Sequence, residues 1–393
     1  MWAFIIWILL IAFTLFYIWR NSNKLPLKIS IPLYLIKIGS GLAIGLYYYH
    51  FKEQSGDSFY FFNTAFEILQ KPISEIFDFI FFSQINLDID TPRSALFLKI
   101  LIPICWVSVS NYWLASILIG SLSYLILFIL FVRYFEFLSK NLLKLIISFF
   151  VFPSVLFWTS GIFKESFVFI SLLISLMALL DYLFKKEVNI WVLILSMLAF
   201  LIFFKLRYFY SIFLLQIVGL YLYRTLSPKF SIPISLLLLA SVIGILIIHP
   251  VLNPIELPSF IYNSHHRILS FGNNGINLYY SFSQADWFSI IVNLPIAFVN
   301  AFLRPFPWEW QNIQMFIYSI ENYILLSAFL FFVFKSNRIA KHQYIIILLI
   351  LVALTFVSLA TPNFGSLYRY KSICLPFLMF ILIHPLKLSF AKS

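Results

Sequence analysis

Four short connections between apolar runs carry basic side chains of the kind that hold phosphate. Arg and Lys bind phosphate oxygens through charge-assisted hydrogen bonds. Positive charge on the outer side of a membrane opposes the usual bias, so several such residues on one face favour an anionic ligand there. Snorkelling, or pairing with a nearby acid, explains any single residue equally well. The connections are SGIFKES with Lys164 and Glu165, FKLRYFY with Lys205 and Arg207, LRPFPWEW with Arg304 and Glu309, and NFGSLYRYK with Arg369 and Lys371.

Seven of the fifteen acidic residues lie in one polar stretch that begins HFKEQSGDSFYFFNTAFEILQKP and ends at Arg93. Asp57 or Ser58 is a good N-cap, so we expect a helix to start here and to lie apolar side down on the membrane. Asp57 then stands at the mouth of the bundle, with Glu53 as a candidate supporting group. An ordinary cap on an interfacial helix is the alternative interpretation of Asp57. The apolar residues at helical spacing are Phe59, Phe62, Phe66 and Leu69.

Histidines and cysteines do not form a metal motif in this sequence. His265 and His266 are adjacent, which is not the spacing of ordinary ligand pairs, so we expect no metal site and treat both as supporting groups. Cys105 and Cys374 lie far apart in apolar segments and are expected to be packing residues. The sequence contains no Gly-rich phosphate loop and no Ser-nucleophile elbow, which argues against nucleotide hydrolysis and acyl-serine chemistry.

The composition identifies the elements that must position these residues. The chain is 62% hydrophobic and 11% charged, with a mean hydropathy of +0.96, which is typical of a polytopic membrane protein. We expect an all-α bundle that forms a single membrane domain over residues 1–393, because the apolar runs have the length that crosses ~30 Å of hydrocarbon. The runs are 1–17, Ile29–Tyr49, Leu145–Trp158, Ile162–Leu183, Val188–Phe204, Ile232–Ile248, Phe316–Phe334, Tyr344–Leu359 and Ser372–Ile383.

The basic clusters set the expected orientation, because Lys and Arg concentrate in cytoplasmic loops. The net charge of +12 is dispersed at segment ends, so membrane orientation explains it better than nucleic-acid binding. Threading gives about eleven crossings and an outward N-terminus if two segments are re-entrant or interfacial, namely one half of Ala95–Phe131 and all of Ser289–Leu303. If both segments instead cross the membrane fully, the chain has about thirteen crossings and the middle of the chain has the opposite orientation. Residues 51–93 become an outer loop with amphipathic interfacial helices, and residues 249–314 an outer cap.

Several of these motifs resemble those of the GT-C class of membrane glycosyltransferases. The stretch GDSFYFFNTAFEIL resembles the first-loop signature of that class, and PSVLFWTSGIFKES, RPFPWEW and GSLYRYKSICLPF are similar to its short basic motifs. They also resemble bacterial envelope proteins grouped with those transferases and with O-antigen polymerases. The chain departs from the pattern because the long loop follows a second span rather than the first.

The resemblance implies an inverting transfer of a sugar from a polyprenyl-phosphate carrier to an acceptor. It implies that Asp57 is the general base that deprotonates the acceptor hydroxyl. The five basic residues Lys164, Arg207, Arg304, Arg369 and Lys371 would grip the carrier phosphate and stabilise leaving-group charge. No cofactor is expected beyond this lipid-linked donor, and a need for a divalent metal is left open. The expected setting is the bacterial cytoplasmic membrane, with an outward active face and a glycan, lipid or protein acceptor.

Three other functions remain open from the sequence. One is a structural subunit of an envelope complex, in which single substitutions of outer-face charges should be tolerated. An O-antigen-type polymerase would act on a polyprenyl-pyrophosphate-linked glycan through outer-face arginines and needs no catalytic Asp. A flippase or transporter of a lipid-linked anion predicts charges within the spans and an internal repeat. The sequence has no recognisable repeat, and its apolar runs hold few charges, chiefly Lys37, Lys99 and Glu321. The transporter is therefore the weaker alternative.

Overall fold

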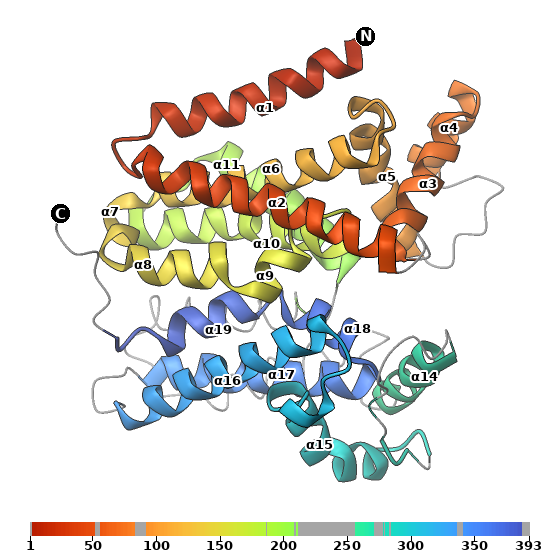
Figure 1. Ribbon diagram of the computed structural model, residues 1–393, viewed down its shortest axis with the longest axis vertical. Coiled ribbons are helices and arrows are strands. Elements are labelled where there is room, and N and C mark those ends of the chain that lie inside the picture. Colours follow the sequence, from red (N-terminus) through yellow and green to blue (C-terminus); the bar gives the residue numbers. More distant parts are fainter. Residues whose placement is uncertain are drawn as a thin grey trace. The chain divides into compact units, whose positions relative to one another are not determined.

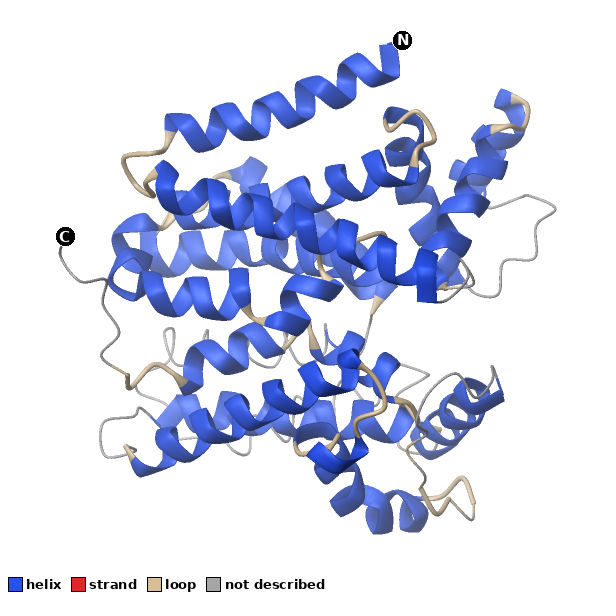
Figure 2. Cartoon of the chain, in the orientation of Figure 1, coloured by secondary structure: helices blue, strands red, loops and turns tan. Residues whose placement is uncertain are grey.

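All regular elements in the described part of this computed structural model are helices, which confirms the predicted all-α class (Figure 2). The chain separates into two compact units, residues 1–208 with 389–393 and residues 209–388, and each is described by itself. The structure describes residues 2–51, 56–82, 92–185, 187–207, 210, 256–270, 278, 280–282, 284–335 and 341–386.

The first unit is built around α6, which packs against α1, α2, α5 and α10 (Figure 1). The α11 helix packs along α10, and α3 packs against α5. Two π-helical segments, Ile146–Val151 and Asp181–Lys185, and a 3-10 turn at Ser139–Asn141 interrupt the regular helices. The helices are α1 Trp2–Arg20, α2 Leu27–Phe51, α3 Asp57–Leu69, α4 Ile73–Phe82, α5 Pro92–Val107, α6 Tyr112–Arg133, α7 Phe135–Leu138, α8 Leu142–Leu145, α9 Pro153–Trp158, α10 Lys164–Leu180 and α11 Ile190–Leu206.

The second unit is built around α17, which packs against α14, α15, α18 and α19. Ile261 of α14, Ile290 and Ala297 of α15, and Leu359 of α17 form one buried apolar cluster. A 3-10 turn, Pro307–Glu309, lies between α15 and α16. The helices are α14 Leu257–Ser270, α15 Trp287–Phe302, α16 Ile313–Phe334, α17 Lys341–Ala360, α18 Phe364–Lys371 and α19 Leu375–Leu382.

Six helices in the described residues are long and apolar enough to cross a membrane, which supports a multi-pass membrane protein. The helices α11 and α15 are apolar but shorter. The threading with about eleven crossings stays a prediction. The six are Trp2–Arg20, Leu27–His50, Tyr112–Arg133, Lys164–Lys185, Ile313–Phe334 and Gln343–Ala360.

Two of the predicted runs are not continuous helices. Leu145–Trp158 is divided into the end of α8, a π-helical segment and α9, which starts at Pro153 because proline suits the first turn of a helix. In Ser372–Ile383 the helix begins only at Leu375 and has 8 residues, roughly 12 Å by the rise of 1.5 Å per residue. The run Ile232–Ile248 lies outside the described residues.

The segment Ala95–Phe131 divides in two where the sequence predicted. Its first half belongs to α5, which has 16 residues with Pro103 inside, and its second half belongs to α6, which has 22 residues. Val109 and Ser110 have positive φ angles in the turn between them, and the Asn111 side chain caps α6 by accepting from the N–H of Trp113 and Leu114. Of the two helices only α6 has the length of a span.

Candidate functional site

The helix that carries Asp57 begins one residue earlier than the predicted caps imply. Gly56 is the N-cap of α3, and no side chain caps this helix. Asp57 is the first residue of the helix, and its side chain is exposed. The prediction that Asp57 or Ser58 caps this helix is therefore wrong, although the predicted helix is present. A carboxylate in the first turn is favourable there, because the N-terminal end of a helix carries partial positive charge.

The remainder of α3 packs into the first unit on one face. Ser58 is buried and its hydroxyl lies 2.6 Å from the Tyr112 hydroxyl, while Phe59 stacks on the Tyr112 ring at 4.0 Å. Phe62 is also buried, whereas Phe66 is exposed. The predicted apolar face is therefore partly covered by protein, and the buried side of α3 also includes Ser58, Phe61, Ala65 and Ile68.

Two helix N-termini meet at the ring of Tyr48 in the first unit. A Cβ added to Gly56 would lie 1.9 Å from Tyr48 Cδ1, so the start of α3 touches this ring. On the other side, the Tyr48 ring lies 5.7 Å from that of Phe163, the N-cap residue of α10. The exposed carboxylate of Asp57 and the first residue of α10, Lys164, therefore belong to neighbouring helix starts.

Lys164 contacts α3 directly. Its Nζ donates a 2.9 Å hydrogen bond to Ser94 Oγ of α5 and lies 4.4 Å from the centroid of the Phe61 ring. Phe61 follows Asp57 by one helical turn, and residues four apart in a helix lie on the same side. Lys164 therefore contacts α3, the helix that begins at Asp57, one turn after its start.

Glu165 and Arg207 form a buried ion pair. The Arg207 Nη2 atom donates to Glu165 Oε1, and their side chains are 8% and 0% exposed. The alternative pairing of Glu165 with Lys164 is wrong, because consecutive helical residues diverge by about 100° and Glu165 points towards the end of α11. This pair joins α10 to the C-cap residue of α11.

In the second unit, Arg304 binds Glu309 through two nitrogens. Arg304 Nε donates to both carboxylate oxygens at 2.9 and 3.1 Å, Nη2 also donates to Oε1, and Nη1 donates to Asn300 Oδ1 at 3.1 Å. The N–H of Phe306 donates to Glu309 Oε2 at 2.7 Å. Burial acts to raise the pKa of Glu309, but the hydrogen bonds from Arg304 and Phe306 together hold it below its ordinary value.

Lys371 is fully buried rather than placed at a surface. Its Nζ donates to the backbone oxygen of Ala301, in the last turn of α15, and to Asn322 Oδ1 at 3.1 Å. A cation at a helix C-terminus is favourable because that end carries partial negative charge. Asn322 in turn donates to the backbone oxygen of Arg304 at 2.6 Å, so Lys371 and Arg304 belong to one network. Arg369 is half-buried, with its guanidinium 6.0 Å from the Tyr370 ring centre.

The two histidines differ in their surroundings. His265 is 2% exposed, and its Nδ1 lies 3.2 Å from the backbone oxygen of Leu359. Burial lowers the pKa of His265 to about 4, so the ring is neutral near pH 7. His266 is exposed and packs on Tyr262 at 4.2 Å. Within the described residues, no three His, Cys, Asp or Glu side chains are grouped closely enough to hold a metal ion.

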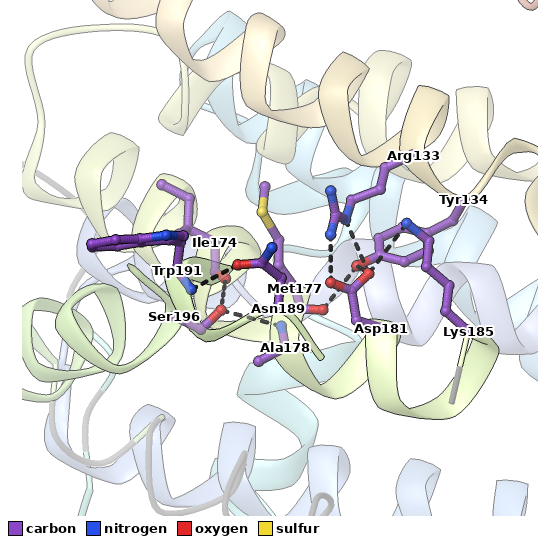
Figure 3. Close-up of polar contacts among 10 residues, drawn as sticks. All are labelled: Arg133, Tyr134, Ile174, Met177, Ala178, Asp181, Lys185, Asn189, Trp191 and Ser196. Atoms are coloured by element: carbon purple, nitrogen blue, oxygen red, sulfur yellow. Dashed lines mark hydrogen bonds and ion pairs between the residues drawn. The ribbon is translucent and has the colours of Figure 1, made fainter. Parts of the chain in front are cut away.

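A polar cluster that the sequence did not predict joins α6 to the end of α10 (Figure 3). Asp181 is 1% exposed and accepts from Arg133 Nε at 3.0 Å and Nη2 at 2.5 Å. The Tyr134 hydroxyl lies 3.0 Å from Asp181 Oδ1, and Lys185 Nζ lies 3.5 Å from the same oxygen. All carboxylate oxygens are used within the protein, so this cluster fixes two helix ends. The only sequence feature that marked this cluster was an acidic residue among basic residues at the ends of apolar runs.

The same close-up shows how a serine of α11 forms hydrogen bonds with the backbone of α10 (Figure 3). Ser196 Oγ of α11 donates to the backbone oxygen of Ile174 at 3.0 Å and accepts from the N–H of Ala178 at 3.1 Å. These two backbone groups are four residues apart, the spacing of one α-helical hydrogen bond, and the Ser196 hydroxyl bonds to both of them. The π-helical segment Asp181–Lys185 follows directly.

The predicted site residues therefore divide between the two units. Asp57, Lys164, Glu165 and Arg207 lie in the first unit, where Lys164 contacts the helix that begins at Asp57. The others lie in the second unit, in which Arg304, Glu309 and Lys371 share one network, whereas Glu53 lies outside the described residues. No protein-family model matches this sequence, and neither a curated protein nor a solved structure shows significant similarity to it.

Proposed function

We propose that this chain is a membrane glycosyltransferase that moves a sugar from a polyprenyl-phosphate carrier to an envelope glycan, lipid or protein. The bacterial cytoplasmic membrane, with the active face outward, is the setting that the distribution of charge favours. The observation that supports the proposal is that an exposed carboxylate, Asp57, and a cation, Lys164, begin two adjoining helices in a membrane protein, and that Lys164 contacts the helix of Asp57.

The proposed roles follow from the chemistry of inverting transfer. The acceptor oxygen attacks the anomeric carbon of the sugar, and the bond from that carbon to the phosphate oxygen breaks. The phosphate leaves with the bonding electrons as the lipid phosphate, and Asp57 takes the proton of the acceptor hydroxyl. Lys164 stabilises the charge that develops on the leaving phosphate. Arg207, Arg304 and Lys371 support the architecture, because each of them donates to a protein group.

The test measures release of the lipid product. The purified protein in lipid nanodiscs would be given a panel of undecaprenyl-phosphate hexoses, with bacterial envelope extract as acceptor, and undecaprenyl phosphate would be quantified. Asp57→Asn is expected to slow release by about 10²–10⁴-fold, the usual share of general base catalysis. Glu67→Gln is the matched control, because Glu67 is an exposed carboxylate on the same helix, and it should retain the full rate.

Two outcomes would overturn the proposal. A folded Asp57→Asn variant with the rate of the unmodified protein would remove the carboxylate from the mechanism. Absence of transfer from every polyprenyl-phosphate hexose, together with extension of a polyprenyl-pyrophosphate-linked glycan, would indicate the polymerase instead. The ion pairing of Arg304 with Glu309 weighs against the polymerase, because that arginine is already bound to a carboxylate.

A further inference from the structure

The connection between α9 and α10, residues 159–163, is a stretch of non-helical backbone buried inside the first unit. It lies along α2, a candidate span. Lys37 Nζ reaches Thr159, a Cβ on Gly41 would lie 2.5 Å from the Ser160 oxygen, and Phe163 meets Tyr48. Non-helical backbone beside a membrane span is tolerated where it is covered by protein or serves a polar site.

This connection contains a backbone donor without an acceptor in the described residues. Thr159 donates to the Val155 oxygen at 3.2 Å and Phe163 donates to the Gly161 oxygen at 2.9 Å. The N–H group of Ser160 donates no backbone hydrogen bond within the described part of the chain, and this residue is buried. Buried backbone N–H groups are nearly always paired, so this one requires an acceptor that the described backbone does not supply.

The indole of Trp158, the residue before this connection, is a further donor. Trp158 is 2% exposed, and its Nε1 has no hydrogen-bond partner in the described residues. Its ring lies 5.2 Å from that of Phe163, the N-cap residue of α10, and no side chain caps this helix. A helix N-terminus and an adjacent unpaired indole N–H both favour an anionic acceptor.

Two lysines place positive charge at either end of the connection. Lys37 is fully buried, its Nζ lies 2.5 Å from Thr159 Oγ1, and no described carboxylate forms an ion pair with it. Lys164 begins α10 at the other end. A buried cation is costly unless a negative group or a helix dipole offsets it, and the C-terminal end of α9 supplies only a partial charge.

We propose that residues 158–163 form a binding site for a phosphate group. Trp158 Nε1 and the N–H group of Ser160 donate to its oxygens, and Lys37 and Lys164 supply the countercharge. The assignment of this phosphate to the sugar carrier rests on the proposed function. Phosphate binding itself is measured without any transfer assay.

The experiment measures binding of undecaprenyl phosphate to the full chain in nanodiscs by native mass spectrometry. Trp158→Phe keeps the ring and removes the donor, and it should weaken binding by roughly ten- to hundred-fold, the effect of losing one hydrogen bond to a charged group. Trp191→Phe is the matched control, because Trp191 is 73% exposed in the same unit, and it should bind as the unmodified protein does. Undecaprenol, which lacks the phosphate, should not compete.

Inorganic phosphate distinguishes the two sources of the ligand. If inorganic phosphate competes with undecaprenyl phosphate, the site recognises the phosphate group itself. If inorganic phosphate does not compete, the site requires a phosphate that is attached to the lipid. Both outcomes support the site. Equal affinity of Trp158→Phe, or equal binding of undecaprenol, would overturn it. If Trp158→Phe does not fold, amide hydrogen exchange of peptide 158–163 is measured in the unmodified protein instead. Undecaprenyl phosphate should slow this exchange and undecaprenol should not. Loss of transfer in Asp57→Asn with unchanged binding in Trp158→Phe would leave the proposed function intact.

Discussion

Removal of one partner of the ion pair between Glu165 and Arg207 should destabilise the first unit strongly. The two side chains are 0% and 8% exposed, so either one left alone is a charge with little access to water. Breaking such a pair costs about 3–5 kcal/mol, whereas replacing both partners by apolar residues of similar size is often neutral. We therefore expect Glu165→Leu and Arg207→Met each to lower Tm by roughly 6–20 °C, on the scale of a unit of this size.

The assay is a double-variant cycle of thermal unfolding in detergent. Glu165→Leu combined with Arg207→Met should recover most of the stability that each single variant loses. The exposed pair of Lys71 and Glu75, separated by 3.5 Å with side chains 27% and 51% exposed, is the control. Its removal should change the free energy of unfolding by about 0–1 kcal/mol.

One result would refute this reasoning. If Arg207→Met shifts Tm no more than Lys71→Met does, the ion pair does not hold α10 to the end of α11. If the same variant also loses undecaprenyl phosphate binding while Glu165→Leu retains it, Arg207 binds the carrier as the sequence predicted.

Three other perturbations test the remaining parts of the structure. Gly56→Ala should destabilise the start of α3 and slow transfer, because its Cβ would lie 1.9 Å from Tyr48 Cδ1; a Tm and rate equal to those of the unmodified protein would contradict the contact. Because Glu309 has a lowered pKa, its contribution to stability is present above the ordinary glutamate pKa near 4.3 and lost as the pH falls through the lower folded value. Glu309→Gln should therefore flatten the pH dependence of Tm in acid. Asp181→Asn should lower Tm by several degrees and Glu136→Gln, an exposed acid nearby, should not; equal effects would argue against the cluster at Asp181.

The sequence alone determined the class of protein and the approximate bounds of its longest helices. Ile29–Tyr49, Phe316–Phe334 and Tyr344–Leu359 were predicted as spans, and α2, α16 and α17 cover them with ends that extend by a few residues. Length and apolar character suffice for such segments, because a backbone in hydrocarbon must bond within its own helix. The helix after Gly56 and the break at Ser108–Asn111 were also predicted, because turn and cap residues act locally.

Only the tertiary structure decided which charges meet. Glu165 pairs with Arg207 rather than with its neighbour Lys164, because successive helical residues point about 100° apart and α11 lies on the side of Glu165. Lys371 was predicted to hold a ligand, yet it is buried on Ala301 at the end of α15, which depends on how α15 and α18 pack. Trp158 lies in the stretch PSVLFWTSGIFKES, but the sequence predicted no role for its side chain. The structure shows that its indole N–H is buried without a partner in the described residues and that its ring contacts Phe163 at the start of α10. Whether a donor has a hydrogen-bond partner depends on the folded chain, so the sequence could not reveal it.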